Sequence, residues 1–480
     1  MSEEILGEIV SERTETNKVF NLGNNKRRLI CYASPIHYKN KKGKWDDIEL
    51  KLEDDGEKFR CDKNKVKFEI KKNKKIAKHI RLKYDNARQF ESTFLKIKID
   101  GIENITGEEY ESTSKETDKK IVNSLPSGIR VIDSLDAVSY RNYIEIDEPI
   151  ENFRIVEELN FKGMRCRNKK EDNRYIPDKY ERFNFVDKNK NLLFSIDRPF
   201  FIDNSGIKNI DVIHTLEEIN GRLIYTKYPT RKGQDDLVLA SYPILIDTTT
   251  FYSKTADGYV SQTRVIGWDG CHDAADGSFS DNASDYNISA MYASHESNKL
   301  ESTAITRSFF YFDTSTLGAG ATISQAILKI YGYADANSKV SAQKGTQATP
   351  LTYIDYDACD VDHVTEHKYG VFEENSGDGD GNWNTGKYNI LNIDGSTDCP
   401  GGGTCDDGRN DIDVTGTTKI CCREYTYDYL DVQPAGSFKN GCYYANESDI
   451  NKRPKLEIDY VKGTTVHIKG ETHVKGGVIY

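Results

Sequence analysis

The residues of this chain whose types and spacing could do chemistry lie mainly in its last third. His363, Glu366 and His367 form the H-x-x-E-H pattern of one class of zinc protease. That chemistry needs both histidines on one face of a helix, with the glutamate beside them to activate a metal-bound water. The acidic segment before the motif and Gly370 after it do not support an amphipathic helix. We therefore predict no protease at this motif.

A calcium-binding loop is a second candidate for chemistry. Asp378, Asp380 and Asn382 have the alternating oxygen spacing with which such a loop begins, and the glycines between them allow the required bend. The closing glutamate of a complete loop is missing, so a solvated acidic loop is the alternative. Calcium is the one cofactor that the sequence suggests, and none is required. A second and weaker set of candidate ligands comprises Asp269, Asp273 and Asp276.

Aromatic residues in or near the polar loops could contact carbohydrate, because apolar ring faces stack on sugar rings. The candidates are Trp268, Trp383, Tyr443 and Tyr444. Packing within a core or loop is the alternative for each of them. The chain has no Gly-x-Ser-x-Gly elbow and no recognisable pair of catalytic carboxylates. We therefore predict a protein that is not an enzyme.

The chain contains 10 cysteines, most of them in its C-terminal half. Cys399 and Cys405 flank a Pro-Gly-Gly-Gly-Thr loop and form a candidate disulfide pair. Cys421 and Cys422 are adjacent, and each would bond more easily to another cysteine than to its neighbour. The absence of any Cys-x-x-Cys pair disfavours zinc. We expect disulfides formed in an oxidising medium, with reduced cysteines as the alternative.

Composition predicts strands packed on modest cores. Hydrophobic residues make up 37% of the 480 positions, and 29 Tyr and 19 Phe against 3 Met favour pleated, half-exposed surfaces. This length predicts two or three domains.

No apolar run is long enough to cross a bilayer, so we predict no membrane insertion. The acidic N-terminus lacks the features of a signal peptide, which favours release within a particle over secretion.

Charge is distributed unevenly along the chain. Residues 251–480 contain 19 Lys and Arg against 33 Asp and Glu, a net charge of −14, whereas the whole chain has a net charge of −11. A phosphate backbone requires a positive protein surface, so nucleic acid is not expected as a partner. The lysines within 63–83 alternate with apolar residues, which predicts the solvent-facing side of strands.

Short segments with alternating apolar and polar residues recur along the chain and predict strands. Residues 129–132 and 143–146 are examples, and residues 40–43 predict a hairpin turn. No long segment has the 3.6-residue period of a helix, so helices should be few and short. The predicted fold class is all-β, with antiparallel β-sandwich or jelly-roll modules in tandem.

Three strand-like segments together resemble one family. They are the aromatic RSFFYFDTS at 307–315, the alternating ISQAILKIY at 323–331 and the closing RPKLEIDY at 453–460. Their arrangement resembles the β-sandwich of DNRLRE-type domain proteins of bacterial walls and phage particles. The hexapeptide itself is absent, so the resemblance depends on the pattern of strands.

The predicted organisation has three modules and a tail. β-rich modules span 1–120 and 121–248, the DNRLRE-like sandwich spans 249–462, and a tail occupies 463–480. Apolar-Lys-Gly units recur around Val461, Ile468 and Val474. Such units predict strands that pair with neighbouring chains, and a flexible basic tail is the alternative.

The resemblance implies a non-enzymatic structural protein of a phage particle, such as a tail or head appendage, fibre or decoration protein. Its loops would attach the particle to the host surface, and many copies would multiply weak contacts. Expected partners are further copies of the chain, other virion or surface proteins, and host-surface carbohydrate. The expected location is the virion or the extracellular space. The alternatives are a bacterial surface adhesin or filament subunit, and a polysaccharide-degrading enzyme or its binding module.

Overall fold

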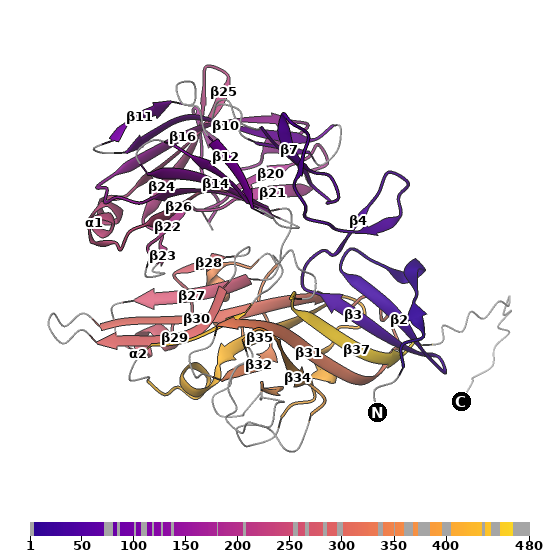
Figure 1. Ribbon diagram of the computed structural model, residues 1–480. Coiled ribbons are helices and arrows are strands. Elements are labelled where there is room, and N and C mark those ends of the chain that lie inside the picture. The colour runs from indigo at the N-terminus through magenta and orange to yellow at the C-terminus, as the bar shows by residue number, and fades with distance from the viewer. Residues whose placement is uncertain are drawn as a thin grey trace, which may run out of the picture.

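The computed structural model contains two β-sandwiches that lie one above the other (Figure 1). Their strands pair antiparallel, and the helices are few and short, so the predicted all-β antiparallel sandwich class is confirmed. The structure describes residues 4–71, 80–83, 87–99, 102–106, 113–117, 120–125, 128–135, 139–179, 181–204, 208–252, 258–264, 268–281, 286–294, 301–334, 339–349, 351–359, 368–372, 385–395, 405–433, 437–442 and 452–463.

The N-terminal sandwich consists of two sheets. The strands of the first are β6 (Glu53–Asp54), β7 (Lys58–Cys61), β8 (Lys67–Lys71), β9 (Ile80–Lys83), β10 (Gln89–Ile99), β11 (Ile102–Thr106), β16 (Phe153–Lys162), β18 (Lys170–Glu171), β19 (Arg174–Tyr175), β24 (Val212–Ile219) and β25 (Arg222–Pro229). Those of the second are β12 (Thr113–Thr117), β13 (Lys120–Ser124), β14 (Ile129–Leu135), β15 (Ser139–Ile146), β17 (Arg165–Cys166), β20 (Phe183–Val186), β21 (Leu192–Ile196), β22 (Phe200–Ile202), β23 (Lys208–Asn209) and β26 (Ile244–Tyr252).

Each of these two sheets combines strands from early and late parts of the region. The first sheet runs β18-β19-β24-β25-β16-β10-β9-β8-β7-β6, and the second runs β12-β13-β14-β15-β26-β21-β20-β17. In β14 every second side chain, beginning with Ile129, is buried, while the residues between are partly exposed. That period is the alternation predicted from the sequence, and it turns one apolar face of each sheet toward the other. Two apolar clusters fill the space between the sheets.

The C-terminal sandwich is built from a 14-stranded sheet that folds back on itself. Its strands are β1 (Gly7–Glu8), β2 (Asn17–Gly23), β3 (Lys26–Tyr32), β27 (Gly258–Arg264), β28 (Phe279–Asp281), β29 (Tyr286–Ser294), β30 (Glu301–Asp313), β31 (Thr322–Ala334), β32 (Val340–Lys344), β33 (Gly370–Val371), β34 (Tyr388–Asn392), β35 (Thr417–Glu424), β36 (Ser437–Cys442) and β37 (Lys455–Val461). The main path runs β1-β2-β3-β37-β31-β36-β29-β30-β35-β32-β33.

Strand β31 takes part in both layers of this sandwich, because it pairs with β37 along one part and with β36 at its end. The main core lies between the layers. Leu328 and Ile458 contribute to it from one layer, and Phe310 and Ile420 from the other. All four side chains are completely buried.

A further layer covers the outer face of β30 and β35. It contains the connector loop (346–349 and 351–359) and two short helical segments, α2 (Trp268–His272) and η4 (Tyr425–Tyr429). Ile305, Phe309 and Cys421 of the sheet form a second apolar cluster with Trp268 and Tyr356 of this layer. Both faces of β30 and β35 are therefore buried, which matches the dense aromatic content of 307–315.

The first strands of the chain belong to the C-terminal sandwich. Strand β3 pairs with β37 along its whole length, from Lys26 opposite Val461 to Tyr32 opposite Lys455. The chain then crosses to the other sandwich through a two-stranded sheet of β4 (His37–Lys39) and β5 (Trp45–Asp47), which forms the predicted hairpin. Strand pairing therefore crosses the predicted module limits at 120 and 248, since the strands of 53–252 interleave within one sandwich.

In the described parts of the chain, helical structure is confined to short connections. The remaining segments are α1 (Arg231–Leu239), η1 (Val10–Glu12), η2 (Tyr353–Asp355) and η3 (Gly408–Asp411). Thr230 caps α1, since its hydroxyl accepts a 3.0 Å hydrogen bond from the amide of Gly233. Among the described residues, no helix is both long and apolar enough to cross a membrane.

Candidate functional site

Most of the residues that the sequence singled out lie outside the described parts of the chain. These are His363, Glu366, His367, Asp378, Asp380, Asn382, Trp383, Cys399, Tyr443 and Tyr444. Cys405 is described and is disulfide-bonded, while its predicted partner Cys399 is not described. The weaker calcium candidates Asp269, Asp273 and Asp276 are all described. No group of three or more potential metal ligands converges among the described residues, so these three do not form a ligand set.

Trp268 lies in the C-terminal sandwich beneath its surface. The residue is only 4% exposed, and its indole nitrogen donates a 2.9 Å hydrogen bond to Asp431. One ring face stacks on His272 at a centroid distance of 5.9 Å. The structure therefore offers no exposed Trp268 ring face for a sugar, and the residue instead anchors α2 to the cluster described next.

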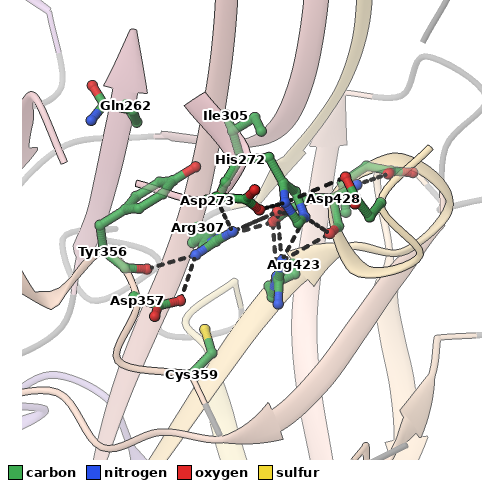
Figure 2. Close-up of polar contacts among 12 residues, drawn as sticks. Gln262, His272, Asp273, Ile305, Arg307, Tyr356, Asp357, Cys359, Arg423 and Asp428 are labelled. Atoms are coloured by element: carbon green, nitrogen blue, oxygen red, sulfur yellow. Dashed lines mark hydrogen bonds and ion pairs between the residues drawn. The ribbon is translucent and has the colours of Figure 1, made fainter. Parts of the chain in front are cut away.

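The most concentrated chemistry of the described chain is a buried cluster of two arginines and one aspartate (Figure 2). Arg307 of β30 and Arg423 of β35 lie in adjacent strands, next to the cross-strand pair Ser308 and Cys422. Two like charges at such positions repel one another unless a counter-charge separates them. Asp428, in η4, supplies that charge. We call these three residues the Arg–Asp cluster.

Both arginines bind Asp428 with two nitrogens each. Arg423 donates to the carboxylate at 2.7 and 2.9 Å, and Arg307 donates at 2.9 and 3.1 Å. The exposed fraction of all three side chains is 1% or less. Burial alone would raise the pKa of Asp428, but the two guanidinium groups outweigh it and hold this pKa well below its ordinary value. The two guanidinium groups thus hold the Asp428 carboxylate in its charged form.

The surrounding groups complete the hydrogen bonding of Arg307. Its Nη1 donates to the carbonyl of Tyr356 at 3.1 Å, and its Nη2 donates to that of His272 at 3.2 Å. The guanidinium also lies over the Tyr356 ring, 4.1 Å from the centroid. These contacts come from the connector loop and from α2, so Arg307 joins both parts of the covering layer to the sheet.

His272 extends the cluster toward the surface. Its Nε2 lies 2.7 Å from the backbone carbonyl of Asp428, and its Nδ1 lies 2.7 Å from the Asp273 carboxylate. Asp431 lies 3.4 Å from the same Nδ1. The imidazole is 1% exposed, whereas both flanking carboxylates reach solvent. Each nitrogen thus faces an oxygen of the protein, so the imidazole serves here as a structural link.

A second group of buried polar residues crosses the middle of the N-terminal sandwich. Lys227 of β25 and Glu157 of β16 form an ion pair from which water is excluded, with exposed fractions of 0% and 2%. Ser92 of β10 donates to the other Glu157 oxygen at 2.8 Å. Burial lowers the pKa of Lys227, and the nearby carboxylate opposes that shift. These inward-facing polar positions lie between apolar residues of the two clusters, and we call the group the polar belt.

The polar belt continues into neighbouring strands of both sheets. On β24, His214 places its Nδ1 2.9 Å from the hydroxyl of Tyr225, and burial lowers its pKa to about 3. On the facing sheet, Asp133 accepts hydrogen bonds from Tyr140 at 2.5 Å and from Asn142 at 2.9 Å. Because each belt residue has partners on adjacent strands, a shift of one residue in register would separate them.

One surface cavity of about 520 Å³ lies beside the hairpin of β24 and β25 and next to β18 and β19. Its walls carry Glu171 and Glu218 among other charged residues. Each of the two carboxylates pairs with a lysine, at 2.7 Å with Lys169 and at 2.6 Å with Lys170. The hydrogen bond from Lys169 lowers the pKa of Glu171, so this carboxyl does not have the raised pKa of a catalytic acid.

Sequence reasoning did not single out the Arg–Asp cluster or the polar belt. Arg307 comes two residues before the aromatic run 309–312, and Arg423 directly follows two cysteines. These apolar neighbours are the one signal that the two arginines face a core. No protein-family model matches the chain. A comparison with curated proteins finds no match either.

Proposed function

We propose that this chain is a non-enzymatic structural protein of a phage particle, such as an appendage, fibre or decoration protein, that displays loops for attachment to the host surface. The proposal keeps the family resemblance of the strand pattern as its starting point. Its mechanism is multivalent display, in which copy number multiplies weak contacts.

The pairing of β3 with β37 is the observation that carries this proposal. Gly7 pairs with Asn21, and Lys26, near the same turn end of the β2–β3 hairpin, pairs with Val461. The first and last described strands therefore lie at one side of the C-terminal sandwich, separated by β2 and β3 (Figure 1). Attachment through this side would leave the whole N-terminal sandwich projecting outward, as a display protein requires.

Buried ionic groups in both sandwiches support a load-bearing role. The polar belt fixes strand register in one sandwich, and the Arg–Asp cluster fixes the covering layer of the other. Both clusters are enclosed and internally paired, so they stabilise a shape and do not present a reacting group. A rigid body with fixed loops keeps its attachment contacts preorganised, which lowers the entropy that binding costs.

Quantitative mass spectrometry of purified particles tests the proposal. We expect the chain in many copies per particle. Labelling with antibodies to each sandwich, viewed by electron microscopy, should place the N-terminal sandwich farther from the particle than the C-terminal one. Absence of the chain from particles would overturn the proposal.

Two further outcomes would identify the alternatives. Recovery of the chain with the bacterial envelope, and not with particles, would indicate an adhesin or filament subunit. Release of reducing sugars from host capsule by the purified chain would indicate a polysaccharide-degrading enzyme. The same capsule binding the chain without sugar release would indicate a binding module.

A further inference from the structure

The connector loop (346–349 and 351–359) lies where the two sandwiches meet, and both contact it. Internally it is held by Asp355, which accepts hydrogen bonds at 2.7 Å from the amides of Ala348 and Thr352. The Thr352 hydroxyl donates to the same carboxylate at 2.9 Å. These bonds give the loop a defined shape, so that displacement at one end is transmitted to the other.

One side of the connector loop is fastened to the C-terminal sandwich. Cys359 forms a disulfide with Cys421 of β35, and their Cα atoms are 5.6 Å apart. The amide of Gly277 donates to the carbonyl of Tyr353 at 2.7 Å. Leu351, Tyr356 and both cysteines are buried in the cluster under the covering layer. The disulfide adds a covalent link to this apolar contact.

Cys359, one of the two cysteines of this disulfide, lies near the Arg–Asp cluster (Figure 2). Arg307 contacts the backbone and ring of Tyr356, and its Nη1 lies 3.4 Å from the carboxylate of Asp357. Tyr356 in turn donates from its hydroxyl to the carbonyl of Cys271 at 3.2 Å. Fixing Cys359 therefore also fixes the residues that satisfy Arg307.

The other side of the connector loop is fastened to the N-terminal sandwich. Arg182 donates from Nη2 to the carbonyl of Leu351 at 3.0 Å, and its Nε donates to Asp197 at 2.7 Å. The Arg182 side chain is only 5% exposed, so water competes little for these bonds. The Tyr353 hydroxyl adds a long contact of 3.5 Å to the carbonyl of Lys179. Arg182 thus links one sandwich to a loop that is covalently attached to the other.

We propose that the Cys359–Cys421 disulfide is a redox-sensitive lock on the arrangement of the two sandwiches. The reductant is a dithiol or thiol. Its thiolate attacks one sulfur of the disulfide and forms a mixed disulfide while the other cysteine leaves as a thiolate and takes up a proton. A second thiol then releases the first cysteine. Two electrons pass to the protein, which gains two thiols, and the reductant becomes a disulfide.

Opening the lock changes the contact between the sandwiches. Without the covalent link, the loop keeps its internal hydrogen bonds but loses one anchor on β35. Arg182 then holds a segment that moves more freely, so the two sandwiches sample more relative orientations. In an oxidising medium the two sandwiches act as one stiff unit, and in a reducing medium they move more independently of each other.

The test compares four forms of the full chain by small-angle X-ray scattering and hydrogen exchange. They are the oxidised protein, the same protein after dithiothreitol, the double variant Cys359→Ala/Cys421→Ala, and the control Cys422→Ala. Cys422 is an adjacent, buried and free cysteine that faces the main core. Thiol labelling and mass spectrometry measure how far the disulfide has been reduced.

We expect reduction and the double variant to produce the same changes. Exchange in 351–359 should accelerate about tenfold or more, and the scattering should show a larger radius of gyration. Because dithiothreitol also reduces the separate disulfide of Cys405, the decisive readout is exchange in 351–359. There the double variant should not respond further to dithiothreitol, whereas Cys422→Ala should respond like the unmodified chain. Strand β30 should keep its protection, which shows that the sandwich remains folded.

Two results would overturn the lock. One is identical scattering and exchange in 351–359 for the oxidised chain and for a folded form without the disulfide. The other is a folded chain whose Cys359–Cys421 bond resists millimolar dithiothreitol, because a lock that no reductant opens is not redox-sensitive. If the double variant fails to fold, the reduced natural chain decides between these outcomes.

Discussion

Leu29 lies opposite Ile458 in neighbouring strands, although the two residues come from opposite ends of the sequence. Both side chains are completely buried in the main core of the C-terminal sandwich. The first strands of the chain are thus a structural part of its last module.

Truncating Leu29 should therefore weaken the C-terminal sandwich. We expect Leu29→Ala to lower the free energy of unfolding by about 2–5 kcal/mol, because it leaves a cavity in a closed core. Chemical denaturation measures the loss, and hydrogen exchange should place it in β37 and β31. Val10→Ala is the matched control, since Val10 is 60% exposed and should change little. Faster exchange confined to the N-terminal sandwich would contradict the assignment.

Breaking the Lys227–Glu157 pair should destabilise the N-terminal sandwich. Glu157→Gln leaves a buried lysine without its counter-charge, and we expect a loss of about 3–5 kcal/mol in unfolding free energy. Glu157→Leu combined with Lys227→Met removes both charges and should recover most of that loss. Denaturant unfolding of the unmodified chain and of both variants measures the loss and its recovery. A double variant as unstable as the single one would show that the belt is needed for more than charge balance.

Stability should fall in acid because His214 is buried in its neutral form. Its pKa is lowered from 6.5 to about 3 in the folded chain, so the unfolded chain binds a proton that the folded chain does not. Between these values, the unfolding free energy should drop by at most about 1.4 kcal/mol for each pH unit of acidification. Above pH 6.5 the contribution of His214 to the unfolding free energy is fully present.

The variant His214→Gln isolates this effect, since it keeps a polar partner for Tyr225 but does not titrate. Denaturant unfolding of both proteins should be measured from pH 7.5 to pH 4.5. The difference in unfolding free energy between them should change steadily below pH 6.5 and stay constant above it. A difference that is independent of pH would show that His214 has the same pKa in the folded and unfolded chains, and would contradict the prediction.

Removing the charge of Asp428 should release the covering layer of the C-terminal sandwich. Asp428→Asn leaves Arg307 and Arg423 side by side without a counter-charge, and we expect a loss of about 3–5 kcal/mol. Hydrogen exchange should accelerate first in η4 and α2, which depend on this carboxylate. Asp431→Asn is the control, because Asp431 is half-exposed and an asparagine keeps an oxygen that can accept the hydrogen bond from Trp268. Equal melting temperatures for both variants would contradict a central role for Asp428.

The sequence alone determined the class of fold and much of the strand positions. Alternation in segments such as 129–135 follows directly from the pleat of a strand, which sends successive side chains to opposite faces. The hairpin at 40–43 depends on local turn chemistry and was predicted for the same reason. The burial of Trp268 did not follow, because a tryptophan can pack inside or face solvent with the same neighbours in sequence.

Only the tertiary structure decided which strands are neighbours. Every strand offers the same backbone donors and acceptors, so backbone hydrogen bonding alone does not determine that β3 pairs with β37. The choice depends on which apolar faces close over one another, a property of the whole chain. For the same reason, Glu157 and Lys227 resemble surface residues in the sequence and become a buried pair only when the facing sheet closes over the sheet that they share.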